Sequence, residues 1–248
     1  MRLYQRMTIS PKSFARVSGS PGTNARVAGA LRVLTPVVAL LSVTGVCLGL
    51  ALPVPRIPTP YNAFLLIICA AGIVATVRWG RERLNNYLVG AQGEEVAGRT
   101  LALLPNPYRV YHGVPIGLSR DLDHVVCGPT GLWVIETTAR EGRVSVRGTE
   151  ILVDGEPMTF SPVEKARRAS EELREALRRR AGVAPEVRAA VCFSGGGLSP
   201  DPATVEGVAL TTPDSLCRLL TRPGEPLNEG VMLRSAAAID LMLSGEHS

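Results

Sequence analysis

Two uninterrupted apolar runs dominate the first third of the chain. They cover Leu34 to Pro53 and Tyr61 to Val77, and neither contains Asp, Glu, Lys, Arg or His. As a helix at roughly 1.5 Å per residue, the first run extends about 30 Å, which is the thickness of a bilayer core. The connection between the runs is rich in proline and short enough for a tight turn. The pattern therefore predicts a transmembrane helical hairpin over residues 34–79. A secretory signal is the alternative, although 33 residues precede the first run and a second run follows it.

The charges around these runs predict their orientation in the membrane. The connection holds one basic residue, Arg56, whereas basic residues flank both outer ends of the hairpin: Arg2, Arg6, Lys12, Arg16, Arg26 and Arg32 before it, and Arg78, Arg81 and Arg83 after it. The positive-inside rule then places both termini in the cytoplasm. We expect a multi-pass protein of a bacterial-type inner cell membrane, with the lipid bilayer as its first partner.

The net charge of +5 comes from the N-terminal end of the chain. Seven of the 27 Lys and Arg residues, and none of the 22 Asp and Glu residues, lie within the first 60 positions. The remainder is therefore slightly acidic and lacks the broad basic surface typical of nucleic-acid binding. The tail of residues 1–33 is rich in Ser, Gly and Pro, so we expect disorder there. Its basic side chains suit anionic lipid headgroups.

From residue 80 onward, the polar and apolar alternation changes to that of a folded domain. Gly90 is expected to interrupt a helix that restarts at 91–104. Ser161, Pro162 and Glu164 form a capping-box start for a long helix that ends at Gly182. The remaining pattern predicts strands at 108–112, 123–127, 132–137, 143–147, 151–153, 187–193 and 208–212, a glycine loop at 194–197, and helices near 213–221 and 230–243. Residues 80–248 thus read as one mixed α/β domain.

The turn at 128–131 predicts a hairpin that brings two carboxylates together. If Pro129 and Thr130 are its loop residues, Asp123 faces Glu136 across the two strands. Opposed side chains share a face of the sheet, with Cβ atoms about 5 Å apart. Two carboxylates at that separation repel each other, and Mg²⁺ or Mn²⁺ would relieve the repulsion, because these cations prefer oxygen ligands. Thr138 projects on the same face and carries no charge.

Glu94 is a third candidate carboxylate, on the inward stripe of the helix that contains Ala97. Each acid also has a simpler interpretation. Asp123 could bond backbone amides at a strand entry, Glu136 could pair with Arg120 or Arg140, and Glu94 could stabilise a helix N-terminus. His124 alternates to the opposite face from Asp123 and is expected to be structural.

Three motifs in order resemble the NERD (nuclease-related) domain. They are Gly-Ala-Gln-Gly-Glu at 90–94, Asp-Leu-Asp-His-Val-Val-Cys-Gly-Pro at 121–129 and Gly-Leu-Trp-Val-Ile-Glu-Thr at 131–137, followed by a proline-led helix at 162. The resemblance extends from residue 90 to about residue 180. It implies an α/β (α+β) restriction-endonuclease-like core, with a mixed sheet flanked by helices. It also implies that Glu94, Asp123 and Glu136 occupy the acidic positions of a divalent-metal site.

Two positions depart from the pattern of that family. The core lysine is replaced by Thr138, and the glutamine usual near the start of the following helix is Lys165. Lys165 is the only lysine after Lys12, and it lies at the edge of the apolar face of its helix. Related nucleases sometimes supply the lysine from a neighbouring helix. Lys165 is therefore a candidate for the catalytic lysine, and a solvated surface residue is the alternative.

These observations leave two functional hypotheses. The first is a membrane-anchored, Mg²⁺- or Mn²⁺-dependent phosphodiesterase acting on nucleic acid, with Asp123, Glu136 and Lys165 as catalytic residues and Glu94, Asp123 and Glu136 as metal ligands. The second is a catalytically degenerate nuclease-like fold that serves as a binding or scaffold module at the cytoplasmic membrane face. Retention of the three acids favours the enzyme. Loss of the core lysine and the near-neutral domain favour the scaffold.

Overall fold

The computed structural model describes residues 14–22, 31, 34–43, 45–46, 59–117, 120–223 and 226–245. The chain divides into two compact units. One comprises Met1–Gly22 together with Gln92–Ser248, and the other comprises Thr23–Ala91. Residues 14–22, which precede the first apolar run, therefore belong to the same unit as the predicted nuclease-like domain.

The unit of Thr23–Ala91 is helical where it is described. Residues 34–43 form helix, and α2 (Thr59–Leu101) continues without a break through Gly90. The expected interruption at Gly90 is therefore wrong, because one glycine weakens a helix by only about 1 kcal/mol. Within the described residues, no helix combines the length and apolar character needed to cross a membrane. The predicted two-span anchor is thus not supported there, while residues 44 and 47–58 of that prediction lie outside the described residues.

A seven-stranded mixed sheet forms the centre of the other unit, in the order β1-β2-β3-β4-β8-β11-β10. Its central strands β4, β8 and β11 run parallel, whereas β2, β3 and β4 form an antiparallel meander. The strands are β1 (Arg16–Ser18), β2 (Arg109–Ile116), β3 (Arg120–Gly128), β4 (Gly131–Thr138), β8 (Val187–Phe193), β10 (Ala203–Val205) and β11 (Val208–Thr211).

A second, four-stranded sheet is inserted after β4, in the order β7-β6-β5-β9. It consists of β5 (Gly142–Arg147), β6 (Glu150–Val153), β7 (Glu156–Pro157) and β9 (Gly196–Ser199). The expected glycine loop at 194–197 is thus only partly a loop, because Gly196 and Gly197 pair with Gly142 and Arg143. Along the chain, β5 follows directly after β4, and β9 follows directly after β8. The small sheet therefore begins beyond the carboxyl ends of these two strands, and Glu136 lies near the carboxyl end of β4.

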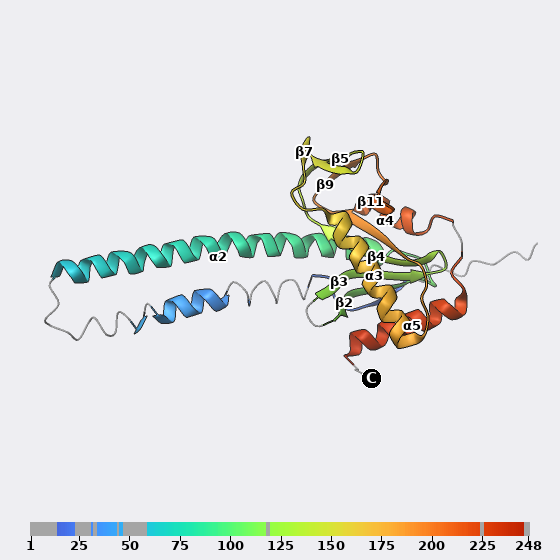
Figure 1. Ribbon diagram of the computed structural model, residues 1–248, viewed down its shortest axis with the longest axis horizontal. Coiled ribbons are helices and arrows are strands. Elements are labelled where there is room, and N and C mark those ends of the chain that lie inside the picture. Colours follow the sequence, from blue (N-terminus) through green and yellow to red (C-terminus); the bar gives the residue numbers. More distant parts are fainter. Residues whose placement is uncertain are drawn as a thin grey trace, which may run out of the picture. The chain divides into compact units, whose positions relative to one another are not determined.

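Helices cover both faces of the main sheet. On one face, α3 (Pro162–Ala181) and α5 (Glu229–Ser244) enclose a core that includes Val125, Val134, Leu173 and Ile239. On the other face, the end of α2 and α4 (Pro213–Leu220) pack on Val126, Trp133 and Ile135. Figure 1 shows α3 running across the strands of the main sheet. The mixed α/β core with a mixed sheet flanked by helices is confirmed.

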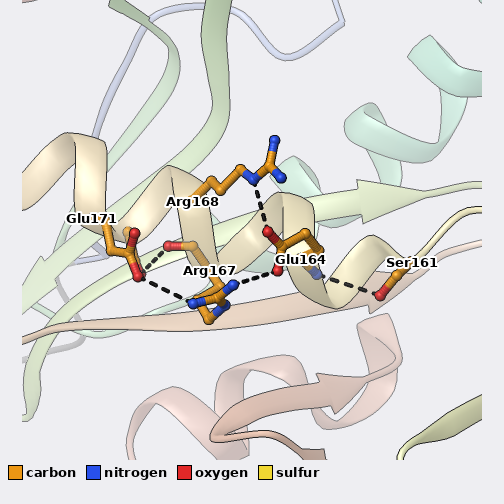
Figure 2. A network of polar contacts seen from close by, with 6 residues as sticks. Ser161, Glu164, Arg167, Arg168 and Glu171 are labelled. Carbon is orange, nitrogen blue, oxygen red and sulfur yellow. Dashed lines mark hydrogen bonds and ion pairs between the residues drawn. The ribbon is translucent and has the colours of Figure 1, made fainter.

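The start and end of α3 follow from its sequence. The Ser161 side chain accepts a hydrogen bond from the backbone N–H of Glu164, Pro162 occupies the first turn, and Gly182 ends the helix in a left-handed conformation. The Glu164 carboxylate does not complete the expected capping box. Instead it accepts from Arg167 at 2.5 Å and from Arg168 at 2.8 Å (Figure 2). The cap and the predicted helix bounds are otherwise confirmed.

The N-terminal tail departs most from expectation. Disorder was expected for residues 1–33, but residues 14–22 are structured and contribute β1 to the main sheet. β1 pairs in parallel with β2, where Val17 lies beside Val110. A strand of three residues is too short to show a period-2 pattern, so it gave no signal in the sequence.

Candidate active site

The β3–β4 hairpin has the predicted register. Gly128 pairs with Gly131, and the ladder continues to His124 and Ile135, which confirms the two-residue loop. This register places Asp123 and Glu136 next along the two strands, on the face covered by α3. The Asp123 carboxylate accepts a hydrogen bond from the backbone N–H of Thr137 at 2.8 Å. The interpretation of Asp123 as an acceptor for a backbone amide is therefore correct, and the same bond orients its carboxylate beside Glu136.

Glu136 is almost completely buried, with 1% of its surface exposed. Its charged partner is Lys165 of α3, whose ammonium forms an ion pair with Glu136 Oε2 and lies 3.7 Å from Asp123 Oδ2. The pairing of Glu136 with Arg120 or Arg140 stays an alternative, and the structure adds a lysine from the covering helix as a charged partner. A buried carboxylate requires such a partner, because burial of an uncompensated charge costs several kcal/mol.

Lys165 differs from its neighbours on α3 in where its side chain points. Arg167 and Arg168 bind Glu164 on the outer side of the helix, and Arg167 also lies 3.6 Å from Glu171 (Figure 2). Lys165 instead reaches the two strand carboxylates, with 37% of its side chain exposed. The Lys165 side chain is therefore both ion-paired and partly exposed. That combination is suited to contact with an incoming anion.

Glu94 completes the acidic cluster from α2. Its pKa is raised from 4.5 to about 7, chiefly by burial and then by the charges of Asp123 and Glu136, while the hydrogen bond from the Gly22 backbone N–H and the charge of Lys165 oppose the rise. Gly22 donates to Glu94 Oε2 at 3.0 Å. Glu94 lies deep inside α2, so the interpretation that it stabilises a helix N-terminus is wrong. The structure thus brings Glu94, Asp123, Glu136 and Lys165 into one electrostatically coupled site.

Gly93 explains how α2 approaches the strand ends so closely. A Cβ at this position would meet the Ser194 hydroxyl and would lie 2.9 Å from the Cβ of Ala139. Only glycine therefore allows the helix to pack here and present Glu94. The signal was visible in the sequence as the glycine directly before Glu94. Its physical meaning appears only once residues 139 and 194 are known to lie beside the helix.

Thr138 occupies the end of β4, where the resemblance places a lysine. Its carbonyl accepts hydrogen bonds from the backbone N–H of Ser194 at 2.9 Å and from the Ser194 hydroxyl at 3.3 Å. These bonds hold the ends of β4 and β8 together. Thr138 therefore supplies strand alignment, and the positive charge of the site comes from Lys165.

His124 is structural, as its place on the opposite face predicted. Its Nδ1 lies 2.7 Å from Nδ1 of His112, and both rings are buried. Burial lowers the pKa of His112 to about 4 and that of His124 to about 3. Both imidazoles are therefore neutral at pH 7, one donating and the other accepting the hydrogen bond.

The donor chemistry of the cluster fits a hard divalent cation. Three carboxylates face one ammonium, and carboxylate oxygens are the ligands that Mg²⁺ and Mn²⁺ prefer. The pKa of Glu94 is raised mainly by burial and next by the charge of Asp123, and a bound cation would oppose both effects by favouring the carboxylate form. In the arrangement that the structure shows, no three His, Cys, Asp or Glu side chains of the described residues lie close enough together to hold a metal ion. Lys165 provides the charge compensation in this arrangement.

The family comparison falls on this same region. Residues 89–194 match the NERD family, described as the nuclease-related domain, and the matched segment includes all four residues of the acidic site. Over this segment the chain is similar to nuclease-related domains, and the mixed sheet with helices on both faces fits that class of protein. No curated protein and no solved structure matches the chain.

Proposed function

We propose that this protein is a divalent-metal-dependent phosphodiesterase that acts on nucleic acid. The observation that carries the proposal is the position of Lys165, whose ammonium contacts the Glu136 carboxylate and lies 3.7 Å from that of Asp123. The positive charge absent at Thr138 is thereby available from α3. The nuclease-related match over residues 89–194 supports the substrate class.

In this proposal each residue has a separate role. Glu94, Asp123 and Glu136 would hold Mg²⁺ or Mn²⁺, which when bound activates water and offsets the charge of a phosphodiester. Asp123 is oriented for this by the Thr137 N–H. Lys165 would contact a non-bridging phosphate oxygen through the exposed part of its side chain, stabilising negative charge as it develops. Because Glu136 is buried, the local dielectric constant is low, which would strengthen the interaction of the carboxylates with the cation and that of Lys165 with the phosphate.

The second candidate is a binding or scaffold module without catalysis. One observation favours it: the Lys165 ammonium already pairs with Glu136 and lies 3.7 Å from Asp123, so part of the negative charge of the site is compensated without a metal. The slightly acidic composition after residue 60 also supports it. This candidate predicts nucleic-acid binding that persists in a chelator and no cleavage.

Membrane attachment is part of the proposal and is supported by the sequence. The runs at 34–53 and 61–77 contain no Asp, Glu, Lys, Arg or His, and basic residues flank their outer ends. We propose that the protein is held at the cell membrane with both termini in the cytoplasm, where the basic tail contacts anionic lipids. Recovery of the full-length protein in the soluble fraction after cell lysis would contradict this.

The deciding experiment is a nuclease assay on the full-length protein. The full chain is required because residues 14–22 belong to the same unit as the site. Plasmid, single-stranded DNA and RNA would be incubated with Mg²⁺ or Mn²⁺, beside an Asp123→Asn/Glu136→Gln variant. Metal-dependent cleavage that disappears in the variant supports the enzyme. Absence of cleavage by folded protein on every substrate, with binding retained in EDTA, supports the scaffold.

A further inference from the structure

The residues 14–22, here called the N-terminal strap, extend the main sheet at its β2 edge. Arg16, Val17 and Ser18 pair in parallel with Arg109, Val110 and Tyr111. The Ala15 N–H donates to the Leu104 carbonyl at 2.8 Å, and the Arg16 N–H donates to the Tyr108 carbonyl at 3.2 Å. The strap is therefore bonded to the end of α2 as well as to the sheet.

Two glycines allow the strap to seat closely. Gly19 has a left-handed φ of +83°, and a Cβ there would overlap the His112 carbonyl oxygen. Pro21 packs against Gly98 of α2, where a Cβ would lie 2.9 Å from the proline Cγ. The path of the strap is thus specified by close backbone contacts over its second half. It is not a loosely associated terminus.

The strap ends on a residue of the acidic site. Gly22 is the last residue before the chain enters the unit of Thr23–Ala91, and the chain returns at Gln92. The Gly22 N–H donates to Oε2 of Glu94, two residues after that return. The strap therefore ends with a hydrogen bond to the Glu94 carboxylate.

We propose that the N-terminal strap is a positioning element of the acidic site, which holds the Glu94 carboxylate in the orientation that cation binding there requires. The backbone N–H of Gly22 occupies one carboxylate oxygen and limits the orientations of the other. The consequence for cation binding rests on the proposed function, whereas the docking of the strap on Glu94 does not.

The first test undocks the strap and measures Mn²⁺ affinity of the full-length protein by electron paramagnetic resonance. Gly19→Val introduces the clash with His112, and we expect Mn²⁺ to bind about 10- to 100-fold more weakly, as when a group that orients a metal ligand is lost. Gly207→Val is the matched control, because Gly207 has a similar φ of +79° but open space around it. Pro21→Ala is a milder variant, with a smaller loss in the same direction.

A double-mutant cycle then separates positioning from general damage. If the strap acts through Glu94, Gly19→Val has no further effect on Mn²⁺ affinity in a Glu94→Gln background. An equal loss in both backgrounds overturns the proposal. A loss in Gly207→Val as large as that in Gly19→Val overturns it as well.

A metal-free measurement decides the docking itself. Hydrogen exchange at the Gly22 amide should be faster in Glu94→Ala than in the wild type, because the amide loses its acceptor. Gln92→Ala, an exposed position on the same helix, should leave the exchange unchanged. If the wild type binds no Mn²⁺, the proposed metal function fails while this comparison still stands. Unchanged exchange in Glu94→Ala overturns the inference whether or not a metal binds.

Discussion

The Lys165 ammonium of α3 is ion-paired with the Glu136 carboxylate of β4, although the residue next but one to Glu136, where a lysine was expected, is Thr138. Glu136 is buried, while more than a third of the Lys165 side chain remains exposed. The positive charge of the site is therefore delivered from the covering helix and not from the strand. This exchange of position underlies the first two predictions.

Loss of Lys165 should abolish metal-dependent cleavage. We expect Lys165→Met to reduce kcat by about 100-fold or more, the effect of removing one group that stabilises the transition-state charge. Adding Thr138→Lys to that variant should restore part of the activity, because it returns the charge to the strand. Arg168→Met is the control on the outer side of the same helix. Full activity in Lys165→Met would refute the role of Lys165.

The ion pair should also contribute to stability. Lys165→Met leaves the Glu136 carboxylate buried without this partner, which we expect to lower the free energy of unfolding by about 1–3 kcal/mol, since the partial exposure of Lys165 moderates the cost. Chemical denaturation measures the effect. Adding Glu136→Gln should recover part of the loss, because a neutral amide is less costly to bury. Simple additivity of the two changes would show that they do not interact.

Glu94 should make the protein less stable as the pH rises through the range of 4.5 to 7. Its pKa is about 7 when folded and ordinarily 4.5, so the folded state binds the extra proton in this interval and stability falls as that proton is lost. The change is on the order of 2–3 kcal/mol by linkage. Glu94→Gln should flatten this part of the pH–stability curve. An identical slope in the variant would assign the effect to another group.

The buried His112–His124 pair should act in the opposite direction at lower pH. Folding lowers both pKa values from 6.5 to about 4 and about 3, so the unfolded state binds more protons between pH 6.5 and 3. Stability contributed by the neutral pair is therefore lost as the pH falls through this window. The imidazole resonances of both residues should stay in their neutral positions down to about pH 5. Titration of either near pH 6.5 would contradict the buried arrangement.

Two glycines of α2 should respond differently to the same substitution. Gly93→Ala places a methyl group against Ser194 and Ala139, so we expect α2 to shift, the protein to lose about 1–3 kcal/mol of stability, and Mn²⁺ affinity to fall. Gly90→Ala, in open space on the same helix, should be neutral or more stable by about 0.5–1 kcal/mol. Thermal unfolding of both variants compares them. Equal destabilisation would refute close packing at Gly93.

Local patterns were enough to predict most elements of the nuclease-like domain. The turn at 128–131 predicted the register of β3 and β4, because strand periodicity and loop length depend on near neighbours. Ser161, Pro162 and Gly182 predicted the bounds of α3 for the same reason. Asp123 and Glu136 could therefore be placed together before any tertiary contact was known.

Tertiary packing decided the rest of the candidate site. The helical wheel put Lys165 only at the edge of an apolar face, and the crossing of α3 over β4 brought its ammonium to Glu136. The placement of Glu94 depended on the approach of α2 at Gly93 and on the Gly22 N–H, which comes from a segment 72 residues earlier in the chain. Periodicity reports which side of an element is buried. It carries no information on which distant element covers that side, because that choice follows from packing of the whole chain.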